Sequence, residues 1–71
     1  MKKNTLNFEM FINEFEIITI SIEPDFEKET FKIIGITLEN DTMVQLDDLP
    51  LKNKDIISNA SKNYFNYIIN L

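Results

Sequence analysis

Isoleucines alternate with polar residues in the first half of the chain, and this pattern limits the fold more than any other feature of the sequence. Ile18, Ile20 and Ile22 are each separated by one polar residue. Successive side chains of a strand point to opposite faces, and β-branched residues favour strands. Residues 16–23 are therefore predicted to form a strand with one apolar face, which needs a neighbouring strand to pair with.

The preceding segment fits two patterns. The even-numbered residues of 5–12 are all apolar, as in a strand, whereas Phe8, Phe11, Ile12 and Phe15 have the spacing of a helix face. The strand next to it in sequence favours the first interpretation, because adjacent segments usually pair. We therefore expect residues 5–12 to form a strand, with the helix as the alternative.

The need to place apolar residues on one face then sets the register of this first hairpin. A three-residue loop at 13–15 pairs Met10 with Ile18 and Phe8 with Ile20, so that one face of the hairpin is uniformly apolar. A two-residue loop would place apolar residues opposite polar ones. The three-residue loop is the expected connection.

The second half of the sheet is predicted in the same way. Residues 24–30 are charged and contain a proline, which indicates a loop. Strands are expected at 31–38 and 43–47, separated by a turn. The residues expected to be buried in the first of these strands are Ile34, Ile36 and Leu38. A second three-residue loop would pair Leu38 with Val44 and Ile36 with Leu46.

A helix is predicted at 53–69. Leu49 precedes a proline and so avoids the helical conformation, and Asn53 is the expected N-terminal cap. The apolar stripe that is expected to face the sheet consists of Ile56, Ile57, Ala60, Tyr64, Tyr67, Ile68 and Leu71. Phe65 is expected either in the core or against a partner.

These elements predict an α+β fold in which residues 1–71 form a single small domain. An antiparallel four-stranded sheet, built from two hairpins, carries one C-terminal helix on one face.

One helix leaves the other face of the sheet uncovered, and exposed apolar patches usually mark interfaces. The residues expected there are Phe11, Phe15, Ile17, Phe31 and Ile33. The alternative is that the helix or the 24–30 loop wraps further, or that the register differs. If the face is an interface, pairing of two identical subunits in a homodimer is the commonest case.

Composition excludes most chemistry. The 71 residues contain no His, Cys, Trp or Arg, so the usual metal ligands, catalytic bases and thiols are missing. Asp47 and Asp48 are expected to diverge at a strand end, and Glu39 and Asp41 lack the ligand spacing of a calcium loop. We expect no catalytic residue, no metal, no cofactor and no small-molecule substrate, and hence no enzyme.

The acidic balance bears on partners and location. The formal charge of −5 and the absence of arginine argue against direct binding to nucleic acid or to an anionic membrane. No apolar run follows Lys2 and Lys3, so no signal peptide is expected, and the predicted location is the cytoplasm of the producing or host cell.

Three stretches, NFEMFINE (7–14), IEP (22–24) and FKIIGITL (31–38), follow one another before the helix. This order resembles small uncharacterised phage and prophage accessory proteins, in which two β-hairpins precede a C-terminal helix. The chain departs from them at Glu14, where they have a turn glycine, and after Asp41, where no glycine follows. The resemblance implies a mobile-element protein without catalytic residues.

The function expected from all this is that of a non-catalytic protein-interaction module, one form of which is an inhibitor of a host defence complex. The alternative is a small structural subunit of a virion or larger assembly.

Overall fold

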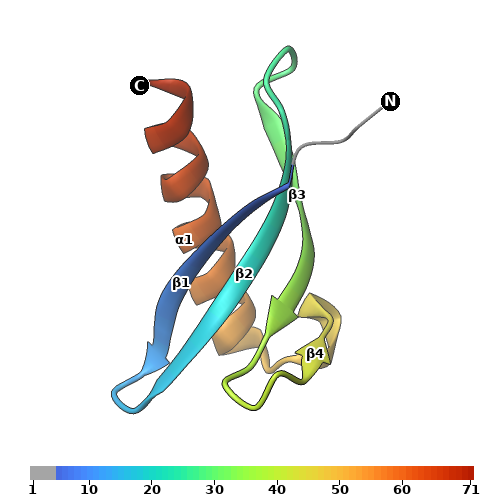
Figure 1. Cartoon of the computed structure of the whole chain (residues 1–71), viewed down its shortest axis with the longest axis vertical. Coiled ribbons are helices and arrows are strands. Elements are labelled where there is room, and N and C mark those ends of the chain that lie inside the picture. Colours follow the sequence, from blue (N-terminus) through green and yellow to red (C-terminus); the bar gives the residue numbers. More distant parts are fainter. Residues whose placement is uncertain (1–4) are drawn as a thin grey trace.

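Residues 5–71, the part of the chain that the computed structural model describes, form a four-stranded antiparallel sheet, a short 3₁₀ helix and one α-helix (Figure 1). The strands lie in the order β1-β2-β3-β4. The elements are β1 (Leu6–Asn13), β2 (Glu16–Asp25), β3 (Thr30–Thr37), β4 (Met43–Val44), the 3₁₀ helix η1 (Leu46–Asp48) and α1 (Leu51–Ile69). The predicted α+β class is confirmed.

The first hairpin has the predicted pairing along its strands but not the predicted three-residue loop. Asn13 pairs with Glu16, so the turn has two residues, and the pairing shifts by one residue between Phe11 and Asn13. Met10 pairs with Ile18 and Phe8 pairs with Ile20, so this segment is a strand and not a helix. At the turn, the Phe15 amide donates a hydrogen bond of 2.8 Å to Asn13 Oδ1. This side-chain bond to the backbone replaces the turn glycine that tight hairpins usually need.

A β-bulge halfway along β3 changes which side chains of that strand point toward the helix. Ser21 pairs with Gly35, but the next residue of β2, Ile22, pairs with Ile33, so Ile34 is the extra residue. A bulge places two residues opposite one and shifts the alternation of every residue beyond it. The predicted burial of Ile34 is therefore wrong, since this side chain is 40% exposed.

The same bulge turns Phe31 and Ile33 toward the helix, which corrects their predicted position on the uncovered face. Both pack against the hydrophobic core. The Phe31 ring lies 5.3 Å from the ring of Phe65 in α1, centre to centre, and Phe26 from the β2–β3 turn stacks on Phe65 at 5.9 Å. These contacts also place Phe65 in the core rather than against a partner.

The second hairpin is shorter than predicted, and its register differs. Ile36 pairs with Val44, not with Leu46, because Leu38 already belongs to the turn. The Leu38 amide donates a hydrogen bond of 2.9 Å to the Thr42 carbonyl, and Asp41 adopts a left-handed conformation with φ of 66°. β4 ends after two residues, where η1 begins.

The helix starts at Leu51, two residues before the predicted start. Pro50 occupies the cap position, so Asn53 lies in the first turn and does not cap the helix. The buried residues of α1 are Ile57, Ser61 and Phe65, spaced by four. Part of the predicted apolar stripe is instead exposed, namely Ile56, Tyr67 and Leu71.

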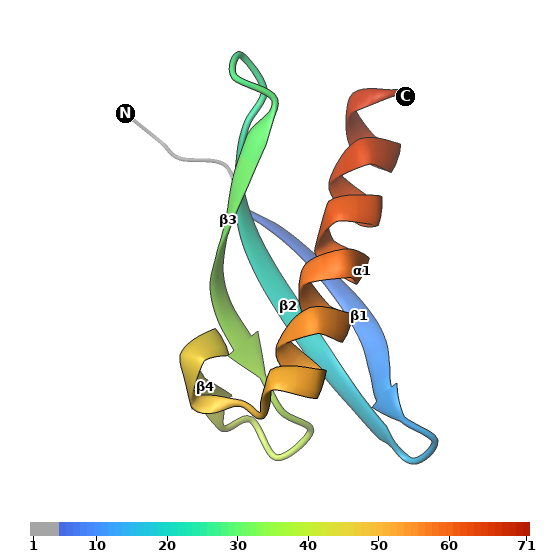
Figure 2. The same ribbon diagram turned by 180° about the vertical axis from the view of Figure 1, so that it is seen from behind.

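The core lies between one side of the sheet and α1 (Figure 2). Its fully buried residues on the sheet are Ile20, Ile22 and Ile36. Phe8 stacks on Tyr64 of the helix, with ring centres 4.5 Å apart. In residues 5–71, no helix is both long and apolar enough to cross a lipid bilayer.

Candidate protein-interaction face

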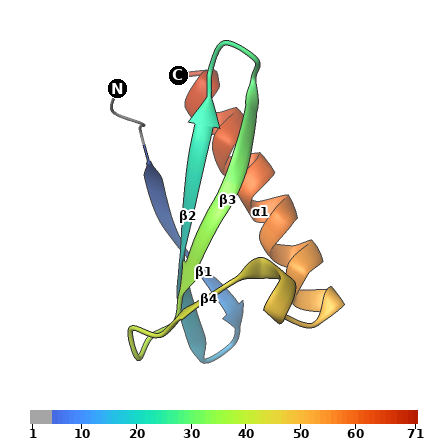
Figure 3. The ribbon, with the colours of Figure 1, turned by 90° about the vertical axis from the view of Figure 1, so that its right-hand side faces the viewer.

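The side of the sheet turned away from α1 is covered by no other element of residues 5–71; we call it the free face. In Figure 1 the strands lie in front of the helix, and Figure 3 shows α1 on one side of the sheet only. Alternation along each strand assigns side chains to this face, with the bulge at Ile34 taken into account. The residues of the free face are Asn7, Glu9, Phe11, Ile17, Thr19, Ser21, Glu23, Lys32, Ile34, Gly35, Thr37 and Met43.

Apolar side chains stand on both flanks of the free face. Phe11, on the outermost strand β1, is 63% exposed, and it pairs across the hairpin with the half-buried Ile17. Met43 is 66% exposed on β4, and Ile34 lies exposed on β3. A small domain with three exposed and one half-buried apolar side chain on one face leaves apolar surface of the kind that partners cover.

Gly35 explains how Met43 comes to lie on this face. The Met43 methyl carbon is 3.3 Å from the position that a Cβ atom on Gly35 would take. A side chain at position 35 would therefore press on Met43, and glycine leaves room for the methionine to lie across the sheet.

The middle of the free face is polar. Ser21 Oγ donates a hydrogen bond of 2.6 Å to Asn7 Oδ1 across the β1–β2 pair, and Thr19 lies opposite Thr37.

A shallow hollow of about 290 Å³ lies at the end of the free face nearest the two hairpin turns. Ile17, Thr19 and Thr37 are among its lining residues, and three carboxylates also line it, those of Glu9, Glu39 and Asp41. Glu39 is held in place, since its Oε1 accepts a hydrogen bond of 2.9 Å from the Ile17 amide. The hollow therefore combines an apolar contact with negative charge.

The other acidic residues singled out in the sequence have ordinary structural partners. Asp47 lies 3.8 Å from the Lys54 ammonium, and Asp48 Oδ2 accepts a hydrogen bond of 3.3 Å from the Gln45 amide. Across residues 5–71, no group of three or more acidic side chains is placed to hold a metal ion.

The structure keeps part of the predicted interaction set together. Phe11 and Ile17 lie side by side on the free face, and Phe15 is 88% exposed at the turn of the same hairpin. Phe31 and Ile33 belong to the core. Sequence reasoning missed Ile34 and Met43, and the signal that could have found them is the single glycine inside a predicted strand, a common mark of a bulge.

No protein-family model, curated protein or solved structure gives a significant match to the chain.

Proposed function

We propose that this chain is a non-catalytic protein-interaction module that binds a protein partner through its free face. The observation that carries the proposal is the apolar set of Phe11, Ile17, Ile34 and Met43, which α1 does not cover. At about 25 cal/mol per Å² of apolar surface, burying most of this set contributes several kcal/mol to binding.

The negative charge beside the free face indicates a partner with positive charge. Three carboxylates, from Glu9, Glu39 and Asp41, border the apolar groups, and the chain has a formal charge of −5. A partner with lysine or arginine around an apolar patch complements this surface. A second copy of the chain is the other candidate partner. Such a homodimer must keep these three carboxylates of one copy away from those of the other.

The test removes apolar surface without changing charge. Phe11→Thr combined with Met43→Thr keeps residues that suit a strand, and Tyr67→Gln is the matched control, since Tyr67 is 64% exposed on the outer side of α1. Tagged chains are isolated from the producing cells, and the mass of each complex is measured by light scattering.

We expect the wild type and Tyr67→Gln to retain one complex of defined mass and the double variant to lose it. The mass distinguishes a homodimer from a complex with another protein. A double variant that keeps the complex contradicts the proposal.

A specific form of this function is an inhibitor of a host defence complex, encoded by a phage or other mobile element and acting in the cytoplasm of the host cell. Acidic side chains can occupy a basic channel where nucleic-acid phosphates would lie. Binding to a basic nuclease that weakens steeply with salt supports this form, and binding indifferent to salt contradicts it.

A small structural subunit is the second candidate, and the edge strand favours it. β1 is eight residues long, and within residues 5–71 no strand pairs with its outer side. Such an edge can accept a strand from a neighbouring subunit. Open-ended assembly in solution favours this candidate over a module with one partner.

A further inference from the structure

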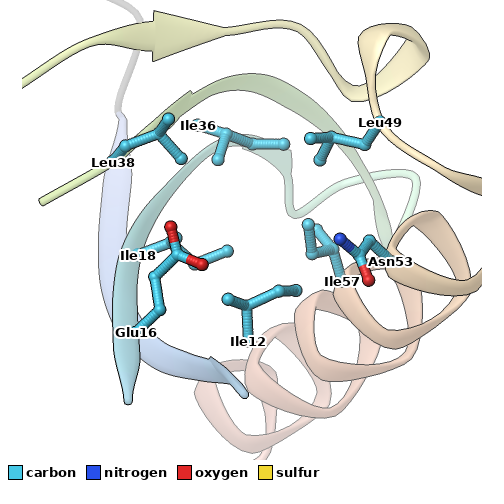
Figure 4. A pocket seen from close by; sticks show the side chains of 8 residues that line it. All are labelled: Ile12, Glu16, Ile18, Ile36, Leu38, Leu49, Asn53 and Ile57. Carbon is cyan, nitrogen blue, oxygen red and sulfur yellow. The ribbon is translucent and has the colours of Figure 1, made fainter. Parts of the chain in front are cut away.

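A second hollow lies on the opposite side of the sheet, where the first turns of α1 diverge from the strands. Its volume is about 150 Å³. Six of its eight lining residues are aliphatic; among them, Ile12 and Ile18 come from the sheet and Ile57 from the helix (Figure 4). The two polar lining residues are Glu16 and Asn53.

Size and lining define the apolar part of a ligand. An engineered cavity of similar volume, lined by leucine, isoleucine and phenylalanine, stays dry and takes up benzene. The walls here are isoleucines and leucines, with no aromatic or charged group apart from Glu16. A ring or branched alkyl group about as large as benzene therefore fits the hollow.

Glu16 defines the other part of the ligand. In Figure 4 its side chain extends from β2 toward the hollow, and the Asn53 carboxamide lies on the helix side. The carboxylate is half-buried and accepts a hydrogen bond of 3.2 Å from Asn13 Nδ2, but none of the lysines in residues 5–71 forms an ion pair with it. A carboxylate partly removed from water beside aliphatic walls is stabilised by a cation.

We propose that this hollow binds a small primary amine that carries an apolar group about as large as a benzene ring. The apolar group lies among the aliphatic side chains, and the ammonium binds the Glu16 carboxylate. The site lies on the helix side of the sheet, so its test is independent of the test of the free face.

The test uses benzylamine as the probe and methyl NMR of the full chain, with isoleucine and leucine methyl groups labelled. We expect saturable shifts at the methyl groups of Ile12, Ile18 and Ile57 and none at the exposed Ile34. Benzyl alcohol has the same ring without the positive charge and should bind about tenfold more weakly or worse, because its hydroxyl forms no ion pair with the Glu16 carboxylate.

Two glutamates of the same hairpin provide the matched variants. Glu16→Gln should weaken benzylamine binding by about tenfold or more and weaken benzyl alcohol binding much less, because only the amine loses an ion pair. Glu14→Gln removes the same charge from the exposed turn, outside the hollow, and should leave both affinities unchanged. Ile12→Phe fills the hollow and should abolish binding of both probes.

Four results would overturn the proposal: no saturable shifts at the lining methyl groups, equal affinity for the amine and the alcohol, an equal effect of Glu14→Gln and Glu16→Gln, or undiminished binding by a folded Ile12→Phe. The first two are measured on the wild-type chain, so they hold even if a variant fails to fold.

Discussion

A single hydroxyl stands out among the buried side chains. Ser61 lies on the sheet-facing side of α1, its side chain is fully buried, and its Oγ has no hydrogen-bond partner. Leaving a buried hydroxyl unpaired costs about 1–3 kcal/mol. The serine therefore lowers the stability of the helix–sheet contact.

We predict that Ser61→Ala raises the free energy of unfolding by about 1–2 kcal/mol, from loss of the unpaired hydroxyl and better helix propensity. Ser58→Ala, at an exposed position of the same helix, should gain only about 0.5 kcal/mol from propensity. Urea unfolding measures both. A loss of stability in Ser61→Ala would mean that the hydroxyl is hydrogen-bonded in the folded chain.

Backbone strain at the β2–β3 turn allows a second test. Glu29 has a φ of 55°, in the left-handed region that costs ordinary residues about 1–2 kcal/mol. Glu29→Gly should therefore raise the thermal midpoint, for a net gain of about 0.5 kcal/mol after the extra entropy of the unfolded chain. Glu27→Gly, in the same turn but without positive φ, should lower it, and equal changes would contradict the strain.

At the scale of elements, alternation predicted the first hairpin and failed in the second. The register of β1 and β2 follows from the alternation of apolar and polar residues, because no extra residue interrupts it between Leu6 and Phe11. In β3 one extra residue at Ile34 exchanges the two faces. Alternation cannot detect a bulge, because Ile33 and Ile34 are the same residue type and only packing of Phe31 on Phe65 decides which one turns inward.

The helix boundaries illustrate the same limit. Proline at position 50 correctly excluded Leu49 from α1, but the helix begins immediately after Pro50, and no side chain caps it. The buried stripe is also rotated relative to the prediction, since Phe65 is buried and Tyr67 is exposed. Which apolar residues of a helix face the core depends on the aromatic contacts from Phe26 and Phe31, which the helix sequence alone does not contain.

Neighbouring isoleucines test the bulge directly. Ile33→Ala should cost about 2–5 kcal/mol, as expected for truncation of a core side chain, whereas Ile34→Ala should cost less than about 1 kcal/mol. Chemical denaturation of the two variants gives both values. The reverse order would mean that β3 runs without a bulge and that Ile34 is the buried residue.

At the scale of the whole molecule, the two sides of the sheet differ in what covers them. One side, with Ile20, Ile22 and Ile36, holds the helix. The other carries Phe11 and Met43 on either flank and an acidic hollow at one end. Fold class and the positions of three of the five predicted interaction residues follow from the sequence, whereas the full set of apolar residues on the free face follows only once the bulge is known.

In this account, the carboxylates of Glu9, Glu39 and Asp41 contribute to partner binding. We therefore predict that Glu39→Gln and Asp41→Asn together weaken binding of a basic partner at low salt and have little effect at high salt. Association measured over a range of salt concentrations checks this. An unchanged affinity at low salt would limit recognition to the apolar groups.

Site-specific photocrosslinking tests the central claim most directly. A photoreactive phenylalanine replaces Phe11 in one chain and Tyr67 in another, two aromatic side chains of nearly equal exposure on opposite sides of the molecule. Illumination in the producing cell should give one discrete crosslinked protein from position 11 and none from position 67. Crosslinks from position 67 alone, or from neither position, would contradict a partner on the free face.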